Sequence, residues 1–400
     1  MLNKTKILFI LIITISVKIY GQKNNDLFLK ANADIINKDY ENAIVNLSYL
    51  INKDNKAKYL IKRSEIYLIQ KEYTNAIKDC IKANKIKQYS ANYQLAIIAV
   101  KQNNYLQAIN YLNKYLLYTK HVQLSELLND SSFYKIHYTQ EWEKLLQQKW
   151  SKNYISSIKN IISFLNKEKY ISALNITNQL ITNNNAELYY LKTNIYTKQN
   201  NYVLALEAIS KALKKHFNKD YLLLRAQIYS KLGNTKLAIK DYNKLIYISP
   251  ENLNLYIYRT KEYLKINRNT KAKNDINFVL KYLPNNCEIN FIKAQISFNN
   301  KNYISTLKTL NILIKTNKGN EDFYILRGDT YMQTKMYKYA AKDYSMALDL
   351  TPRNGNTYYK LAKAQIKNNN KHKACFNIKR AIRYGNKKAV LLKNKYCSEN

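Results

Sequence analysis

The stretch EDFYILRGDTYMQTKMYKYAAKDYSMALDLTP, residues 321–352, decides the fold. It contains two segments whose apolar residues recur at helical spacing, with a short polar turn between them. Aromatic, small and proline residues stand at fixed offsets in it: Tyr324, Gly328, Tyr331, Tyr337, Ala340, Tyr344, Ala347 and Pro352. Two helices cross closely only where a small side chain lies at the crossing, so the pattern predicts a helical hairpin.

The same spacing recurs along most of the chain. Small residues in the second helix of each copy lie 33, 32, 65, 32, 33, 34, 34, 34 and 34 positions apart, so one step is about twice the others. They are Ala43, Ala76, Ala108, Ala173, Ala205, Ala238, Ala272, Thr306, Ala340 and Ala374. Their counterparts in the first helix are Ala31, Ser64, Ala96, Thr193, Ala226, Thr260, Ala294, Gly328 and Ala362. A single period sustained over nine steps indicates a repeat architecture.

The repeat resembles the tetratricopeptide repeat (TPR), whose pattern is a bulky residue, a small one, an aromatic, then Ala, an aromatic, Ala and a closing Pro. The resemblance implies an all-α fold, a right-handed α-solenoid of tandem helix-turn-helix hairpins. Within it, Pro250, Pro284 and Pro352 are expected to end second helices, because proline lacks an amide donor. Gly233 is expected in the turn of its hairpin, where a positive φ costs glycine little.

The N-terminal segment, residues 1–22, is similar to a secretory signal peptide. Lys4 and Lys6 precede an apolar run of eleven residues, Ile7–Val17, which is shorter than the roughly 20 residues that span a bilayer. Gly21 is a small residue at the expected cut, although Lys18 and Tyr20 make that site imperfect. We therefore expect an exported protein, periplasmic, in the cell envelope or secreted. The alternative is an uncleaved anchor, the one route by which this chain would contact a membrane.

The double-length step predicts an interruption of the array. Residues 123–153 are expected to form a degenerate helical hairpin, with short helices at Leu124–Leu128 and Gln140–Gln148 and no repeat spacing in Asp130–Thr139. This hairpin would join a first block of about three repeats, residues 24–122, to a second of about seven, residues 154–388. Trp142 is expected to pack inside it. Residues 389–400 are expected to hold a capping helix and a tail.

The charge has two interpretations. The chain carries 66 Lys and Arg against 27 Asp and Glu, a net charge of +39. A selected basic surface would bind nucleic acid or another polyanion. However, the 38 tyrosines have no electrostatic reason to rise with lysine, and both residues use A/T-rich codons. A genome-wide base bias with solvated helix faces therefore explains the charge better, and polyanion binding remains the second hypothesis.

The resemblance implies that first helices line a concave groove. The inward positions expected to bind a partner are Tyr190, Asn194, Leu223, Gln227, Ile257, Lys261, Phe291, Gln295, Ile325, Asp329, Tyr359 and Lys363. Most repeats pair an apolar or aromatic residue with a polar one, which suits an extended peptide or helix of another protein. The alternative for each apolar member is packing on the neighbouring repeat. The two-carboxylate clamp of some TPR proteins is not expected, because Asp220 stands where that clamp needs a base.

The remaining residues give little sign of chemistry. Catalytic motifs such as GxSxG, a P-loop, HExxH or GxGxxG are absent from the sequence, so we expect a non-catalytic scaffold without cofactor, metal or small-molecule substrate. Four scattered histidines show no metal-binding spacing. Cys80 is expected as a buried thiol, and Cys375 and Cys397 are near enough in sequence to meet as a disulfide. Acidic residues such as Asp220, Asp241, Asp275 and Asp343 are expected on solvent faces, as caps or partners of lysine.

Overall fold

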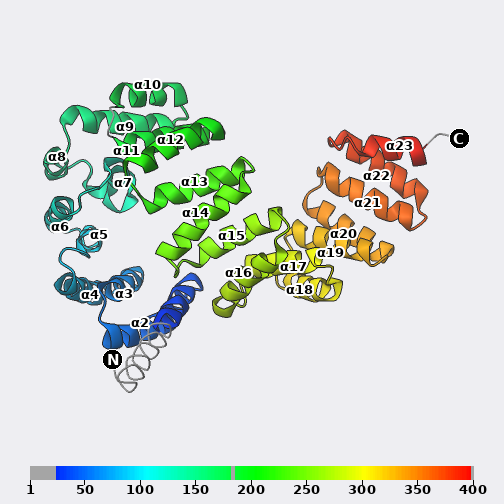
Figure 1. Ribbon diagram of the computed structural model, residues 1–400, viewed down its shortest axis with the longest axis horizontal. Coiled ribbons are helices and arrows are strands. Elements are labelled where there is room, and N and C mark those ends of the chain that lie inside the picture. The colour runs from blue at the N-terminus through cyan, green and yellow to red at the C-terminus, as the bar shows by residue number, and fades with distance from the viewer. Residues whose placement is uncertain (1–23, 182–184, 398–400) are drawn as a thin grey trace, which may run out of the picture. The chain divides into compact units, whose positions relative to one another are not determined.

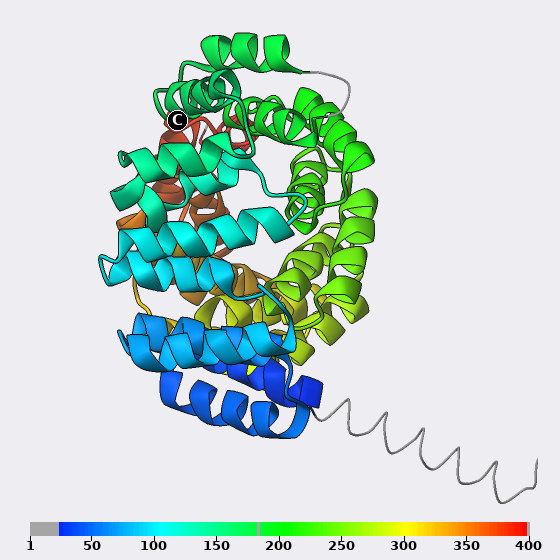
Figure 2. The same ribbon diagram turned by 90° about the vertical axis from the view of Figure 1, so that its left-hand side faces the viewer.

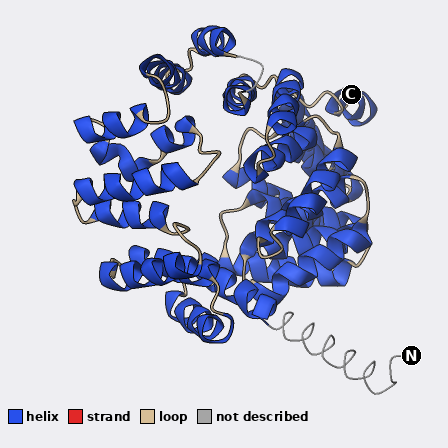
Figure 3. Ribbon diagram, turned by 60° about the vertical axis from the view of Figure 1, so that its left-hand side comes forward, coloured by secondary structure: helices blue, strands red, loops and turns tan. Residues whose placement is uncertain are grey.

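A computed structural model describes residues 24–181 and 185–397, and this part of the chain is built from helices and turns (Figures 1 and 3). The all-α architecture predicted from the repeat spacing is therefore confirmed. The chain divides into two compact units, one up to Leu255 and one from Tyr256, and each is described by itself. Among the described residues, no helix is long and apolar enough to cross a membrane. The expected signal peptide lies outside the described residues and stays a prediction.

Unit 1 begins with a helix over residues 24–36. Its further helices are α2 (Tyr40–Asp54), α3 (Ala57–Ile69), α4 (Tyr73–Ile86), α5 (Asn92–Lys101), α6 (Tyr105–Tyr118), α7 (Leu124–Asn129), the 3-10 helix η1 (Ser131–Ile136), α8 (Gln140–Gln147), α9 (Lys152–Asn166), α10 (Tyr170–Leu180), α11 (Ala186–Lys198), α12 (Tyr202–Lys215), α13 (Lys219–Lys231) and α14 (Thr235–Ile248). Consecutive helices pair as antiparallel hairpins that stack on one another (Figure 2).

Helix α15 (Leu253–Lys265) contains the boundary between the units. The helices of unit 2 are α16 (Asn269–Tyr282), α17 (Cys287–Asn299), α18 (Tyr303–Thr316), α19 (Glu321–Gln333), α20 (Tyr337–Leu350), α21 (Gly355–Lys367), α22 (Lys371–Arg383) and α23 (Ala389–Tyr396). They too form successive hairpins, such as α19 with α20 and α21 with α22.

The small residues lie at the helix crossings, as the spacing predicts. All ten second-helix positions, from Ala43 to Ala374, have no exposed surface. Gly328 shows why size decides the crossing of α19 and α20. A Cβ atom there would lie 2.7 Å from Cε1 of Tyr344, so even alanine would displace that ring. The 34-residue period therefore follows from close helix packing.

The turns follow one backbone design. Gly233 has a φ of +76° between α13 and α14, as predicted. Other repeats reach the same left-handed region without glycine, at φ between +55° and +62°, through Lys38, Lys71, Asn103, Glu168, Asn200, Asn267, Lys301, Lys335 and Asn369. Second helices α14, α16 and α20 end two residues before Pro250, Pro284 and Pro352, which also agrees with the sequence.

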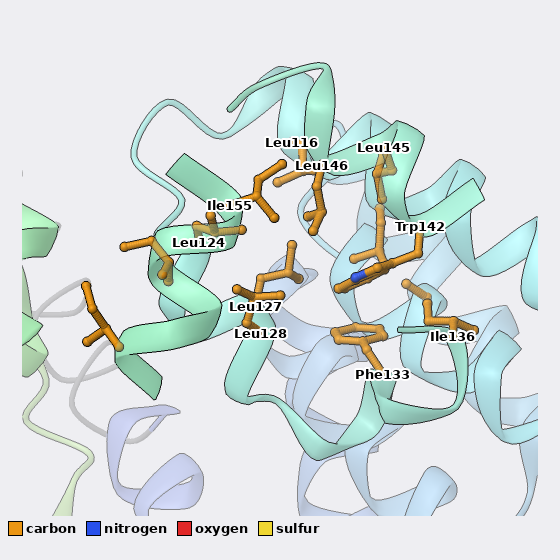
Figure 4. Close-up of a cluster of buried hydrophobic side chains, with 14 of the residues drawn as sticks. Leu116, Leu124, Leu127, Leu128, Phe133, Ile136, Trp142, Leu145, Leu146 and Ile155 are labelled. Atoms are coloured by element: carbon orange, nitrogen blue, oxygen red, sulfur yellow. The ribbon is translucent and has the colours of Figure 1, made fainter. Parts of the chain in front are cut away.

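The insert, residues 123–153, forms the two short helices predicted for it, α7 and α8, joined by η1. Phe133 and Trp142 have no exposed surface, and their ring centroids lie 6.0 Å apart (Figure 4). The insert shares one hydrophobic core with α5, α6, α9 and α11, so Trp142 is a packing residue, as expected. Whether the insert ends one functional block and begins another stays a prediction.

The C-terminal end has the predicted short helix. Ala389 of α23 is buried and Leu392 packs on the core formed by α20, α21 and α22. Val390 and Leu391, the other two aliphatic residues of this helix, expose 43% and 74% of their surface. Only one face of a two-turn helix meets the repeat below it, and these two residues lie on the other.

Candidate functional site

Four of the predicted groove residues meet at one cavity of unit 2. Ile325 and Asp329 of α19 line it together with Tyr359 and Lys363 of α21, and its volume is about 900 Å³. The turn Gly385–Lys388, which precedes α23, closes another side. First-helix side chains of two adjacent repeats therefore face the same concave space, as the repeat register predicts.

The other predicted positions take several environments. Ile257 is 7% exposed, and Phe291 lies 5.0 Å from the ring of Phe323, so both pack against neighbouring side chains. Tyr190 stacks on Tyr221 with centroids 4.8 Å apart. Lys261 forms an exposed ion pair with Glu288 at 2.7 Å. The remaining four are half-buried or exposed: Asn194, Leu223, Gln227 and Gln295.

Asp329 is the fixed acidic group of the unit 2 cavity. The hydroxyl of Tyr344 donates a hydrogen bond of 2.6 Å to its carboxylate, and Nζ of Lys360 donates one of 2.5 Å. Burial and the adjacent Asp329 carboxylate raise the pKa of the Tyr344 hydroxyl well above its ordinary value, so this hydroxyl remains a donor. The contacts neutralise Asp329 and hold it in place.

The other charged side chains of the cavity wall are basic. Lys363 lies with Nζ 5.6 Å from the centre of the Tyr359 ring, and Lys387 and Lys388 stand on the turn. Asn386 fixes that turn, since its side-chain amide donates a hydrogen bond to Oδ1 of Asn356 at 2.8 Å and its Oδ1 accepts one from the backbone amide of Ala389. The cavity thus offers an aromatic ring, an aliphatic side chain and several ammonium groups to a partner.

A disulfide holds the last helix beside this cavity. Cys375 of α22 is bonded to Cys397, just after α23, with Cα atoms 5.6 Å apart. The sequence left this pairing open, and the structure forms it. The lysine-bearing turn lies between the two cysteines, so the disulfide limits how far the turn can move from α22. Cys80 is a buried free thiol, as expected, and burial raises its pKa to about 11.

Comparison with known proteins agrees with the repeat. A tetratricopeptide repeat family model matches residues 220–252. The TPR repeat-containing protein MJ1428 of Methanocaldococcus jannaschii is 26% identical over 334 residues, which cover 75% of this chain and 58% of that protein. Residues 220–252 therefore match a tetratricopeptide repeat, and the chain is similar to TPR proteins over most of its length. The crystal structure of a TPR protein from Parabacteroides merdae shares the fold, with a TM-score of 0.53 and 24% identity over 60% of this chain and 96% of that one.

TPR proteins are in general non-catalytic scaffolds that bind other proteins or peptides. In the residues that the structure describes, no three His, Cys, Asp or Glu side chains group as a metal site would require.

The expectation that the acidic residues lie on solvent faces is wrong for three of them. Asp241, Asp275 and Asp343 are 4%, 7% and 3% exposed, so they do not lie on solvent faces. Each accepts two hydrogen bonds of 2.7–2.8 Å from an arginine sixteen residues earlier: Arg225, Arg259 and Arg327. Arg63 and Asp79 form a fourth such pair. The shared sixteen-residue separation was the signal in the sequence, and the prediction failed because it considered only lysine as a partner.

The sequence did not predict a second group of side chains, a pair of stacked histidines. His121 and His216 lie 95 residues apart in sequence, yet their rings stack with centroids 4.0 Å apart. Helical-face spacing could not find this pair, because both residues lie in loops, one after α6 and the other after α12. The only local signal is that each follows a lysine, in Lys120–His121 and Lys215–His216.

Proposed function

We propose that this TPR protein is an exported scaffold that binds a segment of another protein in the unit 2 cavity. The observation that carries the proposal is that Ile325, Asp329, Tyr359 and Lys363 line one concave space of about 900 Å³. An extended peptide or a helix suits such a space, because apolar and polar groups alternate along it. No reacting group is needed for this role.

The charge around the cavity favours an acidic segment. Asp329 is already paired with Lys360, while Lys363, Lys387 and Lys388 line the same space. A partner with carboxylates beside an apolar side chain would pair with these ammonium groups and cover the Tyr359 ring. The lysines are exposed, so we expect them to affect the association rate and the salt dependence more than the dissociation rate.

Export is supported by two separate features. The first is residues 1–22, with their basic start and short apolar run. The second is the Cys375–Cys397 disulfide, since structural disulfides persist mainly in oxidising compartments. Mass spectrometry of the natively expressed protein tests both features. A mature N-terminus near Gln22 and an oxidised Cys375–Cys397 pair support export, whereas an intact Met1 with both thiols free contradicts it.

Site-specific crosslinking tests the cavity itself. A photoreactive amino acid replaces Tyr359 in one variant and, as the matched control, Tyr339 of α20, which is 55% exposed. We expect one dominant partner protein crosslinked at position 359 in the native cell fraction and little at position 339. Equal crosslinking at both positions, or none at 359, would overturn the cavity as the binding site.

Polyanion binding is the second candidate function, motivated by the net charge of +39. It predicts that affinity for nucleic acid falls by orders of magnitude between roughly 50 and 200 mM salt, because bound counterions are released. The scaffold proposal predicts a smaller loss of affinity over the same range, because three lysines and the apolar contacts of the cavity hold the partner. A salt titration of both complexes distinguishes them.

A further inference from the structure

A second cavity lies in unit 1, where the insert meets the repeats. Its volume is about 670 Å³, within the range of small-molecule sites. It is lined by the loops after α6, α8 and α12, by Asn185 directly before α11, and by the first turns of α9, α11 and α13. Regular repeats bring only neighbouring turns together, whereas here the loop before the insert reaches the loop after α12.

Five basic side chains line this cavity. The stacked rings of His121 and His216 bring the lysines that precede them, Lys120 and Lys215, to the same wall. Lys149 also lines it, and its Nζ donates to the carbonyl oxygens of Leu116 and Thr119, both at 3.0 Å. Lys149 therefore fixes the end of α6, while the two Lys–His pairs face the space.

The one carboxylate among the lining residues already accepts hydrogen bonds from other groups of the protein. Glu187 is 8% exposed and accepts a hydrogen bond of 2.6 Å from the amide of Ser125 and one of 2.9 Å from the hydroxyl of Tyr154. Three lysines against this one glutamate give these charged lining side chains a net charge of about +2. A ligand with a charge near −2 would balance it.

Further lining groups define the chemistry of the ligand. Ser151 and Asn185 cap α9 and α11, so the N-terminal turns of both helices open on the cavity and favour an anion. Gln123 is 6% exposed, and its Oε1 is buried with no hydrogen-bond partner among the described residues. A buried acceptor without a partner is costly, so this atom calls for a ligand that also carries an O–H or N–H donor.

The volume of the cavity narrows the class of anionic ligand further. A phosphate group carries a charge between about −1.5 and −2 at pH 7, which matches the lining. It fills only a small part of the cavity, and the remaining wall includes Trp150 and Tyr221. We propose that this cavity binds a small phosphate monoester, with the phosphate held by Lys120, Lys215 and the histidine pair. This ligand goes beyond the scaffold proposal and departs from the expectation that the chain binds proteins alone.

Isothermal titration calorimetry on the full mature chain tests the proposal. The probes are glucose 6-phosphate, AMP, inorganic phosphate and, as the uncharged match, glucose. We expect at least one monoester to bind once per chain and glucose to give no saturable heat. The double variant Lys120→Gln/Lys215→Gln should weaken that binding at least about tenfold, since hydrogen bonds to charged groups are among the stronger ones. Both lysines are exposed, so the variant should keep the parent melting temperature.

The matched control is Lys236→Gln/Lys240→Gln, which removes two exposed lysines from α14 of the same unit. Its affinity should stay within about twofold of the parent. Equal weakening by both double variants, or no saturable heat with any phosphate probe, would overturn the site, because only the overall charge would then matter. Inorganic phosphate binding more tightly than either monoester would keep the phosphate site and assign it to the free ion.

Discussion

The hairpin α19–α20 and the insert 123–153 both bury aromatic rings, but only the hairpin has small residues where two long helices cross. In the hairpin, Gly328 and Ala340 let two helices approach closely, and the Arg327–Asp343 pair joins them at the edge. In the insert, where a 3-10 segment stands between two short helices, Phe133 and Trp142 fill the space with rings. Two helices that cross closely need small residues at a fixed period. The space between the short helices of the insert needs only side chains large enough to fill it. The insert therefore keeps its packing without keeping the repeat.

The largest expected effect is in the insert. Trp142→Ala should lower the free energy of unfolding of unit 1 by about 3–5 kcal/mol, because it leaves a cavity beside Phe133. Its indole Nε1–H has no hydrogen-bond partner among the described residues, so Trp142→Phe, the matched control, should cost much less. Urea denaturation followed by Trp150 fluorescence measures both. Equal losses would show that the ring does not fill the insert core.

Breaking an arginine–aspartate pair should be the next largest effect. Asp343→Ala leaves the guanidinium of Arg327, which is 19% exposed, without its carboxylate, and should destabilise unit 2 by about 3 kcal/mol. The control is Asp349→Ala, on the exposed face of the same helix, which should stay within about 0.5 kcal/mol of the parent. Circular dichroism during urea denaturation measures the loss. A loss no larger than that of the control would make the pair a surface contact.

These two regions also separate what the sequence predicts from what it does not. Ala340 can be identified from the sequence because each helix crossing requires a small side chain. That requirement recurs at ten positions with a nearly constant spacing. An Arg–Asp pair of this kind occurs four times in the part of the chain that the structure describes, so its period is weaker. His121 and His216 have no period at all. They meet because the loop after α6 lies against the loop after α12, a contact between loops that no repeat spacing encodes.

The sequence likewise predicts only some of the residues that line the unit 2 cavity. Ile325, Asp329, Tyr359 and Lys363 follow from the repeat register, which tells which side of a first helix faces inward. Lys387 and Lys388 do not follow from it, because they stand on the turn after the last repeat. That turn is placed by Asn386 and by the Cys375–Cys397 disulfide, and neither contact has a counterpart in the earlier repeats.

A helix crossing that is tight should not accept a larger side chain. Ala340→Leu should destabilise unit 2 by about 1–3 kcal/mol, because the added atoms overpack the crossing of α19 and α20. Ser345→Leu, at an exposed position of the same helix, is the control and should change stability little. Because coupling in repeat arrays is between neighbours, the loss should appear first in the C-terminal hairpins. Hydrogen exchange measures where it appears, and an unchanged melting temperature would refute the repeat register.

The smallest effect depends on pH and belongs to the insert. Burial, then the charges of Asp220 and Glu187, raise the pKa of the Glu126 carboxyl to about 7. An unfolded glutamate titrates near 4.3, so the folded state binds an extra proton between these values. Stability is therefore greatest at low pH with respect to this group, and falls as the pH rises from about 4 to 7. Above pH 7 the full penalty of the charged carboxylate remains.

Glu126→Gln removes that penalty, because glutamine stays neutral at every pH. We expect the variant to be more stable than the parent at pH 8, by less than about 1 kcal/mol since the side chain is exposed, and nearly equal to it at about pH 4. Glu143→Gln, exposed on α8, is the control and should show no such pH-dependent gain. Melting curves at both pH values measure the difference. A gain that is the same at about pH 4 and at pH 8 would mean that Glu126 is not crowded by Asp220 and Glu187, and that the insert does not bring these loops together.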